Sequence, residues 1–212
     1  VPITEFDESL KPESAINLNL GVDLKISKRL TTNLNFFRNS LNNLIDTRII
    51  ATKTNGQSVF SYFNVQKSYT QGLEFNFTYR PFNNLNVSGG YQLLYAKDKE
   101  AVAAFENGTV YARASASSSA FVLDPSEYFG LYNRSRHTAN FKVFYSIPHY
   151  KADVNMRATY RSKYGLSDTN GNGYLDHYDS FVSGYAILDL ALNKSLSKNI
   201  TFGAGIDNLF DF

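Results

Sequence analysis

Apolar and polar residues alternate with a period of two along most of the chain. From residue 16 to residue 26, the even positions are Ile, Leu or Val and the odd positions are Asn, Gly, Asp or Lys. This period is typical of β-strands with one apolar and one polar face. It predicts eight such strands, at about residues 16–26, 30–51, 58–79, 85–95, 137–147, 152–160, 186–192 and 200–206. Because no helical period is found, we expect an all-β fold.

The connections between the predicted strands alternate in length. Short connections are expected at 27–29, 80–84, 148–150 and 195–199, and longer ones at 52–57, 97–135 and 162–182. Transmembrane β-barrels have this arrangement, with short turns at the periplasmic rim and longer loops at the extracellular rim. A one-residue slip in the alternation across Asn39–Asn43 also predicts a β-bulge.

The two faces of the predicted strands suit a wall between lipid and water. The polar face is rich in Asn, Thr, Ser, Gly and Gln, as expected for a wet lumen. Aromatic residues gather near the strand ends, with Tyr79 and Tyr145 by short turns and Tyr91 and Tyr95 toward long loops. Such girdles mark the two membrane interfaces of a barrel. The two longest strands are about twice the ~9–11 residues that cross a bilayer, so they should project beyond it.

Composition narrows the class of protein further. The chain has 212 residues, of which 43% are hydrophobic, and its mean hydropathy is −0.30. It lacks an apolar run of ~18–20 residues, which excludes an α-helical membrane protein. The absence of Cys excludes a disulfide scaffold, a thiol nucleophile and a Cys-ligated zinc site. A net charge of +2 gives no basic stripe for binding nucleic acid.

No group of residues supports catalysis, so we expect the chain not to be an enzyme. Glu74 and Asp153 lie on the polar faces of different strands, and neither is paired with a base or a nucleophile. The residues His137, His149 and His177 are far apart in the sequence and show no metal-ligand spacing.

Residues 168–179 fit the spacing of a 12-residue calcium loop of EF-hand type. Gly173 takes the sixth position, where the chain must bend sharply, and Leu175 is expected to pack inward. Because Ca²⁺ prefers several oxygen ligands, this spacing predicts a Ca²⁺ site of modest affinity. A polar surface turn rich in Asn and Gly is the alternative. The potential ligands are Asp168, Asn170, Asn172, Tyr174, Asp176 and Asp179.

Basic and aromatic residues near the long loops are candidates for binding a small anionic ligand such as a ferric chelate. They are Arg134, Arg136, Arg157, Arg161, Tyr128 and Tyr132. The parity of Arg157 and Arg161 points both side chains toward the lumen. The alternatives are ordinary lumen polarity, pairing of the Arg residues with acids such as Asp124 and Glu127, and packing of the Tyr rings within the loop.

Four motifs resemble segments of TonB-dependent outer-membrane receptors. Ile206–Asp211 resembles the v-x-N-L-F-D segment near the end of that family, and Asn133–His137 resembles its R-p-r-H strand entry. Leu10–Ser14, leading into Gly21–Val22, is similar to its n-L-k-P-E stretch, and Thr70–Glu74 is similar to its G-v-E strand. The order and spacing of these motifs extend the resemblance over essentially the whole chain.

The resemblance implies an antiparallel transmembrane barrel of about 22 strands, filled by an N-terminal plug. It also implies TonB-energised uptake of a scarce nutrient (a ferric siderophore, haem, cobalamin or a glycan) across a Gram-negative outer membrane. With eight predicted strands and no plug, residues 1–212 would be the C-terminal part of such a barrel. The implied partners are outer-membrane lipid, the remaining barrel and plug, TonB through the plug, and the nutrient.

Two other architectures fit the same alternation. Eight strands are enough to close into a complete small barrel, which would have a structural or adhesion role. A soluble β-sandwich binding module with a calcium-stapled loop would also show one apolar and one polar face on each strand.

Overall fold

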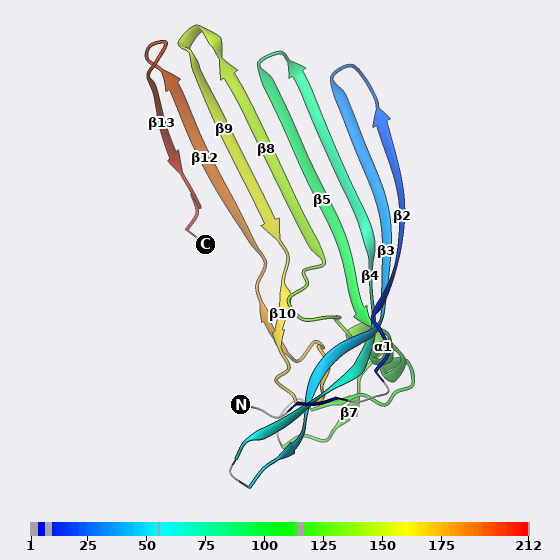
Figure 1. Ribbon diagram of the computed structural model, residues 1–212. Coiled ribbons are helices and arrows are strands. Elements are labelled where there is room, and N and C mark those ends of the chain that lie inside the picture. Colours follow the sequence, from blue (N-terminus) through cyan, green and yellow to red (C-terminus); the bar gives the residue numbers. More distant parts are fainter. Residues whose placement is uncertain (1–3, 7–9, 55, 114–116, 212) are drawn as a thin grey trace.

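The computed structural model describes residues 4–6, 10–54, 56–113 and 117–211. Eight of its strands lie side by side in chain order and antiparallel, which confirms the all-β arrangement expected from the sequence (Figure 1). They are β2 (Ser14–Lys25), β3 (Leu30–Thr52), β4 (Ser58–Phe82), β5 (Leu85–Asp98), β8 (His137–Ile147), β9 (Ala152–Arg161), β12 (Tyr185–Ser195) and β13 (Thr201–Ile206). A further short strand, β1 (Thr4–Phe6), runs parallel to part of β4.

The eight strands form an open wall. Figure 1 shows the short turns at one end of this wall and the long connections at the other, as the alternation in length predicted. One short turn is the 3-10 helix η2 (Pro148–Tyr150). β2 and β13 are the two edges of the wall and do not pair with each other. The described strands therefore form neither a closed small barrel nor the two facing sheets of a sandwich.

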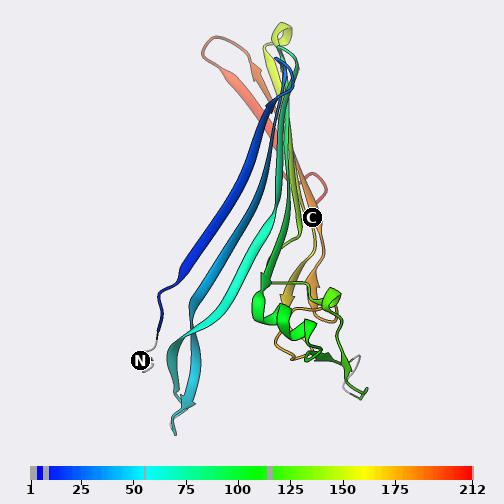
Figure 2. The same cartoon turned by 90° about the vertical axis from the view of Figure 1, so that its right-hand side faces the viewer.

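β3 and β4 form a hairpin that extends past the neighbouring strands, as their predicted lengths required (Figures 1 and 2). β2 pairs with only the first half of β3, and β5 pairs with β4 only from Ser68 onward. The β3–β4 register shifts between Leu41 and Leu44, where Asn43 has a φ of 56°. The predicted β-bulge is confirmed, and it lies where the hairpin leaves the wall. The predicted turn at 52–57 closes the hairpin, although residue 55 lies outside the described residues.

The long connection predicted over residues 97–135 is present, but it contains one helix although the sequence shows no helical period. The helix α1 (Lys99–Glu106) begins after Asp98, whose Oδ1 accepts a hydrogen bond from the Ala101 N–H at 2.8 Å. The helix consists mostly of good helix formers, with the acidic Glu100 in its first turn. Eight residues make only about two turns, so the helical period is too short to stand out. No helix in the described part of the chain is long and apolar enough to cross a membrane.

The two long connections also contain several short elements. The first has the small hairpin of β6 (Tyr111–Ala112) and β7 (Phe121–Val122), followed by the 3-10 helix η1 (Pro125–Glu127). The second has the antiparallel pair β10 (Tyr164–Ser167) and β11 (Ser180–Val182).

These two connections, residues 99–135 and 162–184, pack together into one unit that we call the loop cap. The Phe105 and Tyr174 rings meet edge to face with centroids 5.7 Å apart, and the Phe129 N–H donates to the Leu175 carbonyl at 3.0 Å. Leu175 is 1% exposed, so its predicted inward packing is confirmed. The buried core of the cap consists of Ala101, Phe105, Val110, Ala112, Leu123 and Tyr128.

The wall has opposite chemistry on its two faces, as the alternation predicted. Residues directly opposite each other on neighbouring strands share a face and form a row across the wall. One face carries apolar rows, and its β2 side chains Leu18 and Leu20 are 63% and 68% exposed. The other face carries polar rows such as Asn35, Glu74 and Gln92. Exposed apolar rows on one face and polar rows on the other are typical of a barrel wall with lipid outside and a wet lumen inside.

Candidate ligand-binding surfaces

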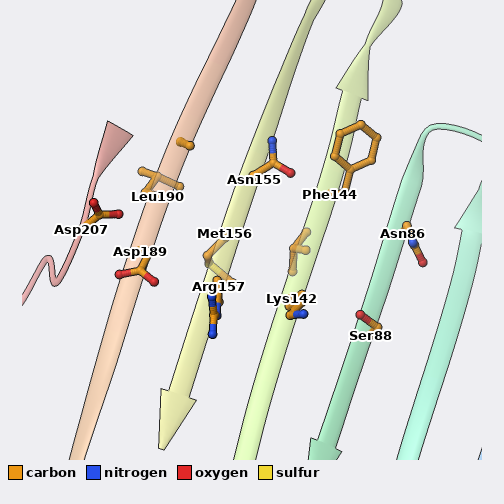
Figure 3. Close-up of a pocket in the computed structure, with 12 residues that line it drawn as sticks. Asn86, Ser88, Lys142, Phe144, Asn155, Met156, Arg157, Asp189, Leu190 and Asp207 are labelled. Atoms are coloured by element: carbon orange, nitrogen blue, oxygen red, sulfur yellow. The ribbon is translucent and has the colours of Figure 1, made fainter. Parts of the chain in front are cut away.

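A hollow of about 450 Å³ lies on the polar face of the wall, over β5, β8, β9 and β12 (Figure 3). Asp189, Arg157 and Lys142 stand directly opposite one another on three neighbouring strands and all line this hollow. Asp189 Oδ1 also accepts a hydrogen bond from the Asn208 N–H at 3.0 Å. With charges of both signs and apolar residues such as Phe144 and Met156 in its lining, the hollow suits a ligand or protein segment that has both polar and apolar groups.

The structure separates the four Arg residues that the sequence placed near the long loops. Arg157 lies in the hollow of the wall, four residues along β9 from Arg161. Four residues of a strand span about 13 Å, which takes Arg157 well away from the rim. Arg134 is exposed near the end of the first cap segment, and Arg136 and Arg161 lie at the same rim. The predicted cluster is therefore limited to three Arg residues.

Arg136 and Arg161 are engaged by the backbone and by aromatic rings. Arg161 Nε donates to Ser135 Oγ at 2.8 Å, and its guanidinium lies 4.0 Å from the centroid of the Tyr164 ring. Arg136 donates to the Phe129 carbonyl at 3.1 Å and lies 4.5 Å from the Phe129 ring centroid. Both side chains thus hold the loop cap against the end of the wall.

Asp124 and Glu127 do not pair with these Arg residues in the described structure. Asp124 Oδ1 accepts a hydrogen bond from the Ser126 N–H at 2.8 Å, and Glu127 Oε2 accepts one from the Asp124 N–H at 2.7 Å. The two acids form a capping box for η1. Hydrogen bonding to Ser126 holds the pKa of the Asp124 carboxyl below its usual range.

The two candidate Tyr residues have different surroundings in the loop cap. Tyr128 is 3% exposed, stacks on Phe105 at 5.0 Å and accepts the Asp98 N–H on its hydroxyl oxygen, so it packs the loop, as the alternative held. Burial raises the pKa of Tyr128 to about 12. Tyr132 lies at a hollow of about 270 Å³ that is lined by residues of both cap segments. Burial, and then the nearby acids headed by Asp168, raise its pKa to about 12.

The 168–179 loop folds around its own acidic and amide side chains. Asp168 accepts the N–H groups of Gly171 and Gly173 at 2.6 and 2.7 Å, and both glycines have positive φ, of 77° and 85°. Asp176 is 0% exposed, and its Oδ2 accepts amide N–H groups from Asn170 and Asn172 at 2.9 and 2.7 Å. The six predicted ligands therefore belong to one compact turn, as the spacing required.

The acids of this loop are not gathered as tightly as in a preformed acidic metal cluster. Among the described residues, no three His, Cys, Asp or Glu side chains lie close enough to hold a metal ion. Asp179 accepts the N–H groups of Thr169 and Asp176, and burial raises the pKa of its carboxyl. The calcium site stays a prediction that would depend on amide and backbone oxygens as well as on carboxylates.

Comparison with known proteins decides the family. The model of TonB dependent receptor-like β-barrels matches residues 3–209 of the chain. The chain belongs to the TonB-dependent receptor family. The family resemblance of its four motifs is thereby confirmed. The expectation that the chain is not an enzyme is also confirmed, because receptors of this family transport ligands.

Individual relatives agree with this placement. The chain is 26% identical to the ferric enterobactin receptor of Pseudomonas aeruginosa, over 97% of the chain and 25% of that receptor. It is 25% identical to the ferrienterobactin receptor of Escherichia coli, over 97% of the chain and 24% of that receptor. The fold is similar to that of the FrpB iron transporter from Neisseria meningitidis, with 16% identity and a TM-score of 0.65, over all of the chain and 28% of the transporter. The chain thus spans about a quarter of the length of these relatives.

Sequence reasoning missed two residues of the wall hollow, Lys142 and Asp189. Both lie at polar-face positions of strands that the alternation predicted. The signal that would have found them is the register between strands, because only direct cross-strand pairing aligns them with Arg157.

Proposed function

We propose that the chain is part of the barrel of an outer-membrane receptor that takes up a ferric siderophore with energy supplied through TonB. The polar face would line the lumen, and the loop cap would form part of the extracellular entrance. The plug, the remaining barrel wall and TonB are the partners this role requires. The location would be the outer membrane of a Gram-negative bacterium.

One observation carries this proposal: an apolar outward face and a polar inward face on a wall that matches the receptor barrel family over residues 3–209. Such a wall needs lipid on one side and water on the other. Among the nutrients considered, a ferric siderophore is favoured because the two relatives are named as receptors for ferric enterobactin. Haem, cobalamin and glycans remain as outcomes of the test.

The test is nutrient uptake by cells that carry the full-length receptor. A deletion strain and a strain complemented with the full-length gene would be compared for uptake of ⁵⁵Fe-enterobactin, haem, labelled cobalamin and a labelled oligosaccharide. We expect loss of ⁵⁵Fe-siderophore uptake on deletion and recovery on complementation, with the same loss when TonB is absent. If complementation restored uptake of haem, cobalamin or the oligosaccharide instead, the assignment of a ferric siderophore as the nutrient would be wrong. Uptake that did not require TonB would contradict the proposed energy source.

We also propose that the 168–179 loop binds Ca²⁺ through the predicted ligands. Support comes from Asp176, which is 0% exposed and has amide and backbone N–H groups, but no cationic side chain, as its described partners. A buried carboxylate gains from a nearby cation. The loop lies against the first cap segment, where Asn172 donates to the Tyr111 carbonyl at 3.2 Å. Bound Ca²⁺ would therefore hold the two cap segments together.

Limited proteolysis of the full-length receptor during a Ca²⁺ titration tests this second proposal. We expect Ca²⁺, and not an equal concentration of Mg²⁺, to slow cleavage within residues 162–184. The double variant Asp168→Asn and Asp179→Asn should lose this protection. Asp124→Asn is the matched control, since it changes an acid of the same cap outside the loop. If Ca²⁺ protected the parent receptor, the double variant and the control equally, or protected none of them, the site would be rejected.

A further inference from the structure

Two Asn-Gly pairs follow each other directly in the 168–179 loop. They are Asn170–Gly171 and Asn172–Gly173, and both glycines have positive φ, of 77° and 85°. An Asn that is followed by Gly is prone to spontaneous loss of its side-chain amide. The reason is that the missing Cβ of the Gly lets the next backbone nitrogen approach the Asn side chain closely. The loop therefore contains two neighbouring positions at which this reaction is chemically favoured.

The reaction requires three groups to move. The backbone nitrogen of the Gly loses its proton and attacks the Cγ atom of the preceding Asn. The new N–Cγ bond closes a succinimide ring, and the Cγ–Nδ2 bond breaks and releases ammonia. Water then opens the ring at one of its two carbonyls, which leaves an aspartate or an isoaspartate in the chain. One water is consumed and one ammonia is released, without an oxidant or a reductant.

A single carboxylate holds both attacking nitrogens. Asp168 Oδ1 accepts the Gly171 N–H at 2.6 Å, and Asp168 Oδ2 accepts the Gly173 N–H at 2.7 Å. The nucleophile in the reaction is the nitrogen without its proton. A negative charge at hydrogen-bond distance disfavours the formation of this second anion. Asp168 therefore slows the first step at both pairs.

Both ends of each Asn side chain are also held. The Asn170 carboxamide oxygen accepts the Asn172 N–H at 3.0 Å, and the Asn172 carboxamide oxygen accepts the Tyr174 N–H at 2.9 Å. The two amide nitrogens donate to Asp176 Oδ2 at 2.9 and 2.7 Å. The Cγ atoms are thus kept from turning toward the attacking nitrogens, and the leaving nitrogens are bound to a carboxylate. Every group that must move in either reaction is fixed while the loop keeps this closed form.

Conversion of either Asn would break this closed form. An aspartate in place of Asn170 or Asn172 would put a second carboxylate at hydrogen-bond distance from Asp176. Asp176 is 0% exposed, so solvent would screen the repulsion between the two carboxylates poorly. Conversion of Asn172 would also remove the amide that donates to the Tyr111 carbonyl at 3.2 Å. A converted loop would therefore separate from the first cap segment.

We propose that Asn170 and Asn172 are sites of spontaneous deamidation that the closed loop protects and that an opened loop exposes. The closed loop keeps both side-chain amides because Asp168 and Asp176 hold the reacting groups. An opening of the loop releases these groups to water, and conversion of one Asn then prevents the loop from closing again. A reversible opening thereby becomes a permanent change in the loop cap. The inference goes beyond transport and does not require bound Ca²⁺.

Peptide mapping of the full-length receptor by mass spectrometry tests this proposal. The receptor would be incubated in detergent with a chelator at mildly alkaline pH, both folded and unfolded in denaturant, and conversion would be measured at each Asn. Asn107 precedes Gly108 at the exposed end of α1, and no other described residue holds its side-chain amide, so it is the internal reference. The test variant is Asp168→Ala. Its matched control is Asp124→Ala, which removes a carboxylate that accepts a backbone N–H elsewhere in the cap.

We expect Asn170 and Asn172 to convert at least about tenfold more slowly in the folded receptor than in the unfolded one, because the reaction must wait for local opening. The protection of Asn107 should be much smaller. Asp168→Ala should remove most of the protection of the two loop residues, and Asp124→Ala should retain it. Equal rates in the folded and unfolded parent would overturn the proposal, even if Asp168→Ala did not fold. Full protection in a folded Asp168→Ala receptor would also overturn it.

The consequence of conversion is tested separately with the double variant Asn170→Asp and Asn172→Asp. Limited proteolysis in the chelator should cleave this variant within residues 162–184 several-fold faster than the parent. Asn107→Asp is the matched control, since it makes the same change at an Asn-Gly pair outside the loop, and it should be cleaved there at the parent rate. Cleavage of the double variant at the parent rate would show that a converted loop still closes, which contradicts the proposal.

Discussion

The wall and the loop cap of this chain are stabilised in opposite ways. The wall exposes its apolar side chains on one outer face, with Leu20 68% exposed. The cap encloses its apolar side chains, with Phe105 and Leu123 each 1% exposed. The wall is thus suited to a lipid solvent, and its strands are joined by cross-strand hydrogen bonds. The cap is suited to water and depends on a small hydrophobic core.

The largest expected effect is the loss of that small core. Phe105→Ala removes a ring that stacks on Tyr128 and meets Tyr174 edge to face, which should cost the cap about 3–5 kcal/mol. Hydrogen exchange of the full-length receptor should show faster exchange across residues 99–135 and unchanged exchange in β8 and β9. Equal loosening of the wall would show that the two regions are not independent.

A charge on the lipid-facing side of the wall should have the next largest effect. Phe77 lies on the outward face beside Phe141, with ring centroids 6.5 Å apart. Phe77→Lys should destabilise the embedded wall by about 2–4 kcal/mol, the range for a cation near the membrane midplane of a barrel. The inward neighbour change Thr78→Lys is the control and should cost far less. The free energy of unfolding would be measured with denaturant in lipid vesicles. Similar losses of stability for Phe77→Lys and Thr78→Lys would contradict the assignment of the outward and inward faces.

Alkaline pH should destabilise the loop cap more than the wall. Because the folded cap raises the pKa of Tyr128 to about 12, the neutral phenol contributes stability below the unfolded pKa of about 10. This contribution, roughly 2–3 kcal/mol, should be lost as pH rises from about 10 to about 12. Proteolysis of the cap as a function of pH would measure the loss. In Tyr128→Phe the loss of stability between about pH 10 and pH 12 should be reduced to the part due to Tyr132, whose pKa is also raised to about 12, and an unchanged profile would contradict the assignment to Tyr128.

The smallest effect is expected at the bulge between the wall and the projecting hairpin. Asn43 has a φ of 56°, a left-handed conformation that β-branched residues avoid. Asn43→Val should lower thermal stability by about 1–2 kcal/mol, whereas Asn43→Gly should change it by only a few tenths. Melting of the receptor in detergent would compare the two. An equal loss for Gly would indicate that the Asn43 side chain, which also donates to the Pro12 carbonyl, matters more than its backbone.

The wall could be predicted from the sequence, whereas the cap could not. Each strand of the wall has its own period-two signal, and a slip in that signal located the bulge to within two residues. The cap has no comparable local signal, because its core joins Phe105 to Tyr174, which are far apart in the sequence. The helix start was nevertheless present in the sequence, as Asp98 before a run rich in Ala and Glu.

The candidate site was only partly predictable for the same reason. Residue type and parity placed Arg157 on the lumen face, but position along the strand put it in the hollow with Lys142 and Asp189. Tyr128 was a candidate ligand contact because loops carry function. Its 3% exposure shows that a loop with its own core also needs aromatic residues for packing. Only the three-dimensional arrangement distinguishes these two uses.

The bulge at Asn43 divides the β3–β4 hairpin into a part bound to the wall and a part paired only with itself and β1. Beyond this point no long neighbouring strand constrains the register. Residue pairs can therefore be added to or removed from the hairpin tip without moving any position of the wall. The tip around Gly56 is consequently a natural place to insert an epitope tag or a fluorescent label, and length variation among receptors of this kind should concentrate there.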